Sequence, residues 1–188
     1  RVNMVSAFVS PSVWKDGNGP ASDDVFLAGP VYGGLDLSAT TDLTALVLTA
    51  RDHEGVLHVR SYFWMPQDSV IEAAKRDRAP YDVWVRSELL RTTPGKVIDY
   101  AFVARDIGAL TADLPVARIG FDRWRMDRMQ TALDNASVSL PLHRALHYHS
   151  EAPQPVESAG IACLACVSSG LRARQSESIT GLVDQRSM

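Results

Sequence analysis

The chain has little of several things that mark special classes of protein. Of its 188 residues, 7% are aromatic and two are cysteines, and the formal net charge is only −3. Such a charge gives no global basic signature, but it does not exclude DNA, because a local basic groove can lie beside an acidic metal site. Cys163 and Cys166 form one C-x-x-C, a spacing typical of a redox pair or of half a zinc site. Without a second pair, an unligated reduced pair is the preferred interpretation.

Long hydrophobic runs are also missing. No run approaches the roughly 20 apolar residues that span a bilayer, and the amino-terminal segment has no signal-peptide pattern. We therefore expect a soluble, cytoplasmic protein that does not bind a membrane. A hydrophobic share of 46% and a charged share of 22% are ordinary, which argues against wholesale disorder and for one domain with a substantial core. Because the chain begins with Arg1, we also expect a longer parent protein.

The first half of the chain predicts an antiparallel meander. Residues 1–30 are rich in turn-forming clusters and are interpreted as a linker or arm. Three apolar segments then read as strands, and residues 52–55 fit a hairpin turn between the last two. The predicted strands are Val31 to Leu37, Val56 to Trp64 and, between them, Leu43 to Thr49.

The second half predicts helices alternating with strands. Residues 67–78 and 81–90 are compatible with helix, residues 97–98 with a short extended piece, and residues 100–114 carry apolar side chains at helical spacing. Residues 116–122 read as a buried strand, and Met126, Met129 and Leu133 then recur on one helical face. Strand, helix, strand and helix imply parallel pairing, so the fold class is α/β, a mixed sheet flanked by helices.

Asp36 and Asp122 are the candidate catalytic residues. Asp36 lies in an apolar run that reads as a buried strand, where a lone carboxylate is costly unless a partner or metal compensates it. Asp122 ends another apolar run, and neighbouring strands lie roughly 4.8 Å apart. Two such carboxylates can hold the Mg²⁺ or Mn²⁺ pair that phosphoryl hydrolysis needs. Gly34 and Gly120 share a face with them, which suggests an open pocket. The alternative is that each Asp ends a strand and caps the next turn or helix.

Other polar residues near this pair have two interpretations each. Ser38 could orient Asp36 or a phosphate, or simply shape a turn, and Asp42 more plainly shapes the loop. The arginines Arg123, Arg125 and Arg128 suit a DNA backbone, but a solvated helix face explains them equally well.

Two further motifs resemble known functional sites, but each lacks a residue that its site needs. Residues 94–97 approach a phosphate loop, but the upstream Gly and the following Ser or Thr are missing. His143 and His147 are four residues apart, but no Glu follows His143, so a zinc protease site is not expected.

With these residues placed, the chain resembles the nuclease domain of tailed-phage large terminase subunits over residues 8–142. The ordered motifs include Phe63-Trp64-Met65-Pro66, residues 93–100, Gly34-Leu35-Asp36-Leu37-Ser38 and Phe121-Asp122-Arg123-Trp124. The resemblance implies an RNase H-like fold and an endonuclease that cuts double-stranded viral DNA during packaging. It makes Asp36 and Asp122 the first two ligands of two Mg²⁺ or Mn²⁺ ions.

The same resemblance sets the expected domains and partners. Residues 1–30 would be the arm from an upstream ATPase motor domain, residues 31–142 the nuclease domain, and residues 143–188 an off-pattern tail. The small terminase subunit and the portal would be partners, in the cytoplasm of a bacterial host.

The tail departs from the family pattern. Family members carry a third carboxylate near the end, whereas here Thr180 stands at the corresponding place in residues 178–181. Asp184 is the only acidic residue after it and is the candidate substitute. Because the body fits the pattern and the tail does not, a truncated or frameshifted reading frame is one hypothesis, and a catalytically weak or inactive copy is its consequence.

Two rival functions remain open from the residues. Actin-like and sugar-kinase ATPases also begin with a strand, an Asp and a Ser/Thr-rich hairpin that binds phosphate, which residues 34–41 fit loosely. The other rival is a non-catalytic DNA-packaging remnant that keeps the fold and has lost the third ligand.

Overall fold

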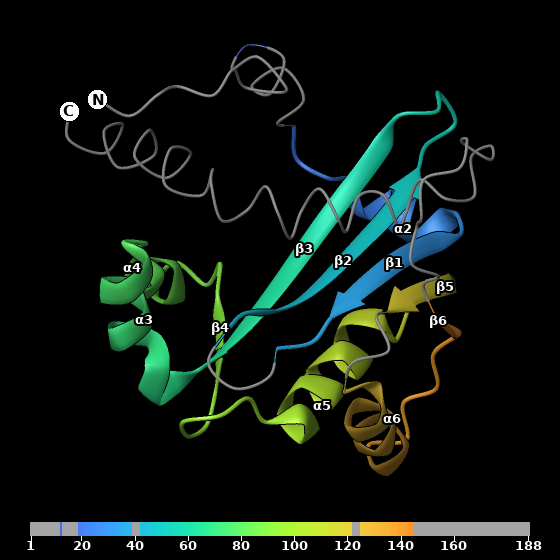
Figure 1. The fold of residues 1–188 in the computed structure, drawn as a ribbon. Coiled ribbons are helices and arrows are strands. Elements are labelled where there is room, and N and C mark those ends of the chain that lie inside the picture. The colour runs from blue at the N-terminus through green and yellow to red at the C-terminus, as the bar shows by residue number, and fades with distance from the viewer. Residues whose placement is uncertain (1–11, 13–18, 39–41, 122–124, 145–188) are drawn as a thin grey trace, which may run out of the picture.

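A six-stranded mixed sheet forms the centre of the molecule (Figure 1). The computed structural model describes residue 12 and residues 19–38, 42–121 and 125–144. The order of the strands across the sheet is β4-β3-β2-β1-β5-β6. In chain order they are β1 (Val31–Asp36), β2 (Thr44–Arg51), β3 (Leu57–Pro66), β4 (Arg91–Thr93), β5 (Val116–Phe121) and β6 (Leu142–Arg144).

The helices are short. In the region that the structure describes, none is long and apolar enough to cross a membrane. In chain order they are α2 (Asp23–Ala28), the 3₁₀ turn η1 (Gln67–Ser69), α3 (Val70–Asp77), α4 (Tyr81–Arg86), α5 (Tyr100–Thr111) and α6 (Met126–Asn135).

The opening meander has the predicted antiparallel pairing of β1 with β2 and of β2 with β3. The turn between β2 and β3 is held by Asp52, whose Oδ1 accepts the N–H groups of Glu54 and Val56 at 2.9 Å. Gly55 has a φ of +84°, a left-handed conformation that a side chain would disfavour. These contacts explain why the chain reverses at this point.

Asp52 also contacts His58, whose Nε2 lies 3.2 Å from the Asp52 Oδ2. Burial raises the pKa of Asp52, but the hydrogen bonds from the Val56 backbone, the His58 ring and the Glu54 backbone together lower this pKa by more than burial raises it. The net result is a pKa of Asp52 below its ordinary value. The charged form of Asp52 therefore stabilises the hairpin.

The second half adds parallel strands, as predicted. β5 pairs in parallel with β1, and β6 pairs in parallel with β5. The predicted extended piece at residues 97–98 is wrong, because the strand lies earlier, at β4. Ile98 is instead buried just before Asp99, whose side chain accepts the N–H groups of Ala101 and Phe102 and so starts α5.

The main core lies between one face of the sheet and the helices α2, α5 and α6. Figure 1 shows α5 and α6 side by side. Phe26 of α2 is fully buried there, so part of residues 1–30 packs against the sheet. The helical face predicted in α6 is confirmed, with Met126, Met129 and Leu133 all buried.

A second, smaller core lies at the β3 and β4 end of the sheet, under α3 and α4. Tyr81 and Trp84 of α4 contact edge to face, with ring centroids 5.2 Å apart. The helix predicted over residues 81–90 is shorter than expected, because it ends at Arg86. Glu88 then takes a φ of +60°, which turns the chain back toward β4.

Candidate functional site

The candidate site lies at the carboxyl ends of the two central parallel strands. Asp36 is the last residue of β1, and the parallel ladder with β5 ends at the pair formed by Leu35 and Phe121. Leu35 and Phe121 are thus paired, and in the sequence each is followed directly by one of the two candidate residues, Asp36 and Asp122. Asp122 lies outside the described residues, as does Arg123.

Asp36 is exposed, so the prediction that it is buried within its strand is wrong. Along β1, the side chains of Val31 and Leu35 enter the main core, and Asp36 follows on the other face, at the end of the strand. An apolar run in the sequence does not show where its strand ends or which face of the sheet the core covers. An exposed carboxylate is also easier for a hydrated metal ion to reach.

The two glycines that share the Asp36 face are direct neighbours. Gly34 of β1 pairs with Gly120 of β5, and both are buried. The open pocket suggested at this position remains a prediction. Two cavities in the described structure lie elsewhere: one of about 420 Å³ beside β3 and β4, and one of about 530 Å³ between α5 and residues 136–141.

Ser38, which follows Asp36 closely, is anchored on both sides. Its N–H donates to the Thr44 Oγ1 at 3.0 Å, and its carbonyl accepts a hydrogen bond from the Tyr100 hydroxyl at 2.6 Å. Ser38 is 6% exposed, and its own hydroxyl has no hydrogen-bond partner among the described residues. The chain leaving Asp36 is thus fixed to β2 and to the start of α5.

Thr44 and Tyr100 were not identified as functional residues from the sequence. Tyr100 lies far along the chain from Ser38, and no local pattern connects the two. The available signal was position, because Tyr100 ends one of the motifs on which the family resemblance rests. We regard both as residues that position the Asp36 segment.

Of the three candidate arginines, Arg125 and Arg128 are among the described residues and lie at the start of α6. Arg125 is exposed and precedes the helix with a φ of +65°, and Arg128 is exposed on the face away from Met126 and Met129. Their contact with DNA stays a prediction, whereas the buried hydroxyl of Ser38 does not suit the DNA contact predicted for it. Asp184, the candidate third carboxylate, lies outside the described residues.

The loop residue Asp42 is part of an exposed ion-pair group. Its Oδ1 lies 3.4 Å from the Arg76 Nη2, and the Arg76 Nε lies 2.7 Å from the Asp77 Oδ1. The hydrogen bond and the charge of Asp77 raise the pKa of Arg76. Asp42 therefore connects its loop to α3 through Arg76, which agrees with its interpretation as a residue that shapes the loop.

The segment that approaches a phosphate loop has a structural role. Gly95 has a φ of +86°, its carbonyl accepts the Asp68 N–H at 3.2 Å, and the Lys96 carbonyl accepts the Ser69 hydroxyl at 3.2 Å. Nowhere in residues 19–38, 42–121 or 125–144 do three His, Cys, Asp or Glu side chains gather to hold a metal ion. His143 is exposed in β6.

Comparison with known proteins agrees with this arrangement. A family model described as the endonuclease domain of the terminase large subunit matches residues 20–158. The large terminase subunit of Enterobacteria phage HK97 is 48% identical over 143 residues, which are 76% of this chain and 28% of that protein. The chain thus spans little more than a quarter of this relative.

The fold is similar as well. A crystal structure of the HK97 bacteriophage large terminase matches with a TM-score of 0.67 and 45% identity, covering 74% of this chain and 28% of that one. This likeness confirms the predicted RNase H-like α/β class with its mixed sheet. By sequence and by fold, this chain belongs to the family of terminase large subunit endonuclease domains.

Proposed function

We propose that this chain is a metal-dependent endonuclease domain that hydrolyses phosphodiester bonds of double-stranded DNA during viral DNA packaging. The observation that carries the proposal is the parallel register of β1 and β5, which ends at Leu35 and Phe121. In this register, two acidic positions come at the carboxyl ends of two neighbouring strands: Asp36 ends β1, and Asp122 follows β5 in the sequence. Family membership makes phosphodiester hydrolysis the reaction to expect there.

The residues suit Mg²⁺ or Mn²⁺. Hard divalent ions prefer carboxylate oxygens, and Asp36 offers an exposed carboxylate at a strand end. Asp36 and Asp122 would hold two ions, and Asp184 is the candidate third ligand. When bound, such ions supply the hydroxide nucleophile and stabilise the leaving oxygen.

The other residues of the site hold the chain and the DNA. Thr44 and Tyr100 fix the segment after Asp36 through the Ser38 backbone, so the carboxylate keeps one position. Arg125 and Arg128 are exposed cations that suit contact with phosphates, and we assign the same role to Arg123. Ser38 is buried, so we assign to it the positioning of the Asp36 segment instead of a DNA contact.

The wider context of the proposal comes from the family. A large terminase subunit would combine this domain with an ATPase motor and would work with the small terminase subunit and the portal. The place of action would be the cytoplasm of an infected or lysogenic bacterium.

A plasmid-cutting assay tests the proposal directly. The purified chain should nick or linearise supercoiled DNA with Mg²⁺ or Mn²⁺ and should stop when EDTA is added. Asp36→Asn and Asp122→Asn should each lower the rate at least about 100-fold, because each removes a metal ligand. Asp127→Asn, an exposed carboxylate of α6, is the matched control and should cut normally.

DNA binding separates the nuclease from its rival. Both Asn variants should bind DNA as well as the parent chain or more tightly, since acidic repulsion is removed. Cutting that survives Asp36→Asn or EDTA would overturn the proposal. A parent chain that binds DNA and never cuts it would instead identify a non-catalytic packaging remnant.

A further inference from the structure

One edge of the sheet is left unpaired along much of β3. β4 pairs with β3 only from Trp64 to Pro66. On that side, the rest of β3, Leu57 to Phe63, has no partner strand among the described residues. Backbone N–H and C=O groups that point outward from this stretch of roughly 20 Å therefore have no ladder partner there.

This edge lacks the usual protection. Exposed edge strands are commonly guarded by Lys or Pro, or by charges that point at an incoming strand. The segment from Leu57 to Phe63 has neither Lys nor Pro, and its two basic residues are already engaged. His58 contacts Asp52, while Arg60 pairs with Asp23 and lies 4.2 Å from the centre of the Phe26 ring.

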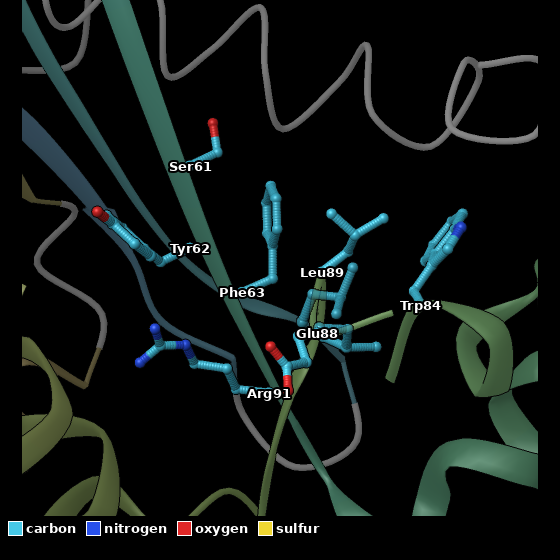
Figure 2. A pocket seen from close by; sticks show the side chains of 9 residues that line it. Ser61, Tyr62, Phe63, Trp84, Glu88, Leu89 and Arg91 are labelled. Atoms are coloured by element: carbon cyan, nitrogen blue, oxygen red, sulfur yellow. The ribbon is translucent and has the colours of Figure 1, made fainter. Parts of the chain in front are cut away.

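A largely apolar pocket of about 420 Å³ lies where β4 begins and the unpaired edge starts. Figure 2 shows Tyr62 and Phe63 on opposite sides of β3, so the pocket extends around the edge of the sheet. Leu89 and Trp84 also line it, and Leu89 is 56% exposed. Unpaired backbone and a pocket for a side chain thus lie side by side.

The rim of this pocket carries an unusual residue. Glu88 has a φ of +60°, a left-handed conformation that residues with a side chain rarely adopt. It is exposed, and no ion pair of its carboxylate exists within the described part of the chain. Backbone hydrogen bonds from Glu88 and Leu89 to the end of α4 hold this turn, so the carboxylate lies next to an exposed leucine. Arg91 also lines the pocket, but it pairs with Asp106.

We propose that this edge binds a partner protein by strand addition: an extended segment pairs with Leu57 to Phe63, places an apolar side chain in the pocket, and sets a basic side chain beside Glu88. Main-chain hydrogen bonds supply affinity in this mode, and pockets for alternate side chains supply specificity. The charge of Glu88 selects a basic peptide. It also disfavours DNA, whose phosphates repel a carboxylate. The proposal does not depend on the nuclease function.

A defined peptide tests it. The probe is a fluorescent hexapeptide in which lysine and valine alternate, and its control has the same sequence with alternate amides N-methylated, so that it cannot add as a strand. Fluorescence anisotropy with the 188-residue chain should show saturable binding of the first and at least tenfold weaker binding of the second. Amide hydrogen exchange should slow within residues 57–63.

Paired variants locate the contact. Leu89→Asp should weaken binding about tenfold through the lost apolar contact, and Ile71→Asp, at another exposed apolar residue, in α3, should not. Glu88→Lys should weaken it about two- to fivefold, the range of an exposed ion pair, whereas Glu72→Lys should leave it unchanged.

Several results would overturn the proposal. They are equal binding of the methylated peptide, protection outside residues 57–63, or equal effects of the paired variants. A chain that self-associates through this edge, with Leu89→Asp restoring the monomer, would identify a second copy as the occupant and would also overturn it. Because plasmid cutting is measured separately, failure here leaves the nuclease proposal standing.

Discussion

Replacing Tyr100 by Phe should loosen the segment that follows Asp36. The Tyr100 hydroxyl donates a 2.6 Å hydrogen bond to the Ser38 carbonyl, and Ser38 is almost fully buried. The variant keeps the ring and removes only the hydroxyl, so the buried carbonyl loses this donor. A lost bond of this kind costs about 1 to 2 kcal/mol. For a chain of this length, the melting temperature should fall by about 2 to 8 °C.

Urea unfolding followed by circular dichroism measures the stability change, and Tyr32→Phe is the matched control. Tyr32 is 44% exposed, and no contact of its hydroxyl is present among the described residues, so its variant should stay within about 0.5 kcal/mol of the parent. Equal stability of the two variants would refute the reasoning. It would mean that the hydrogen bond to Ser38 contributes nothing.

A second measurement separates positioning from stability. If Tyr100 keeps Asp36 in place for a metal ion, Tyr100→Phe should raise the Mg²⁺ concentration needed for half-maximal cutting, by up to about tenfold. The rate at saturating Mg²⁺ should change little. A purely structural role would instead lower the amount of folded protein without moving the Mg²⁺ dependence.

Three further variants probe the fold. Gly33→Ala should cost about 1 to 3 kcal/mol in urea unfolding, because its Cβ would lie 2.9 Å from a Leu48 methyl carbon and 3.1 Å from a backbone oxygen. Asp106→Ala should cost about 2 to 3 kcal/mol by the same assay, since the indole N–H of fully buried Trp64 donates to Asp106 at 2.6 Å; a loss below 0.5 kcal/mol would contradict this role. Asp52 has a lowered pKa, so the stability that its charge contributes is present above the ordinary pKa and is lost as the pH falls through the pKa of the folded state. Asp52→Asn should therefore be less stable than the parent at neutral pH, and in acid unfolding the two stabilities should become equal.

Hydrophobic pattern predicted the parts of the fold that are long and regular. The meander of β1 to β3 and the helices α5 and α6 each extend over enough residues for a period to appear. β4 and β6 have three residues each, which is too short for any period, and their pairing depends on neighbours that are distant in sequence.

The pairing of the two strands that precede the candidate carboxylates was predictable from the sequence, whereas the environment of Asp36 was not. The pattern of apolar runs that end in Asp suggested neighbouring strands, and the ladder that ends at Leu35 and Phe121 has that arrangement. The exposure of Asp36 could not be read from the run around it, because it depends on which sheet face the helices cover. The Tyr100 contact with Ser38 depends on tertiary packing alone.

The pairing of β1 with β5 also has a consequence for how the chain folds. These strands are neighbours in the sheet, although the whole meander, α3, α4 and α5 lie between them in sequence. Closing so long a loop is entropically costly, so this contact is expected to form late in folding. The segment carrying Asp36 would thus meet the end of β5 only after the intervening elements have packed. Partly folded chains and fragments that stop before β5 would lack the proposed metal site, so the proposed DNA cutting would be confined to molecules that have completed their fold.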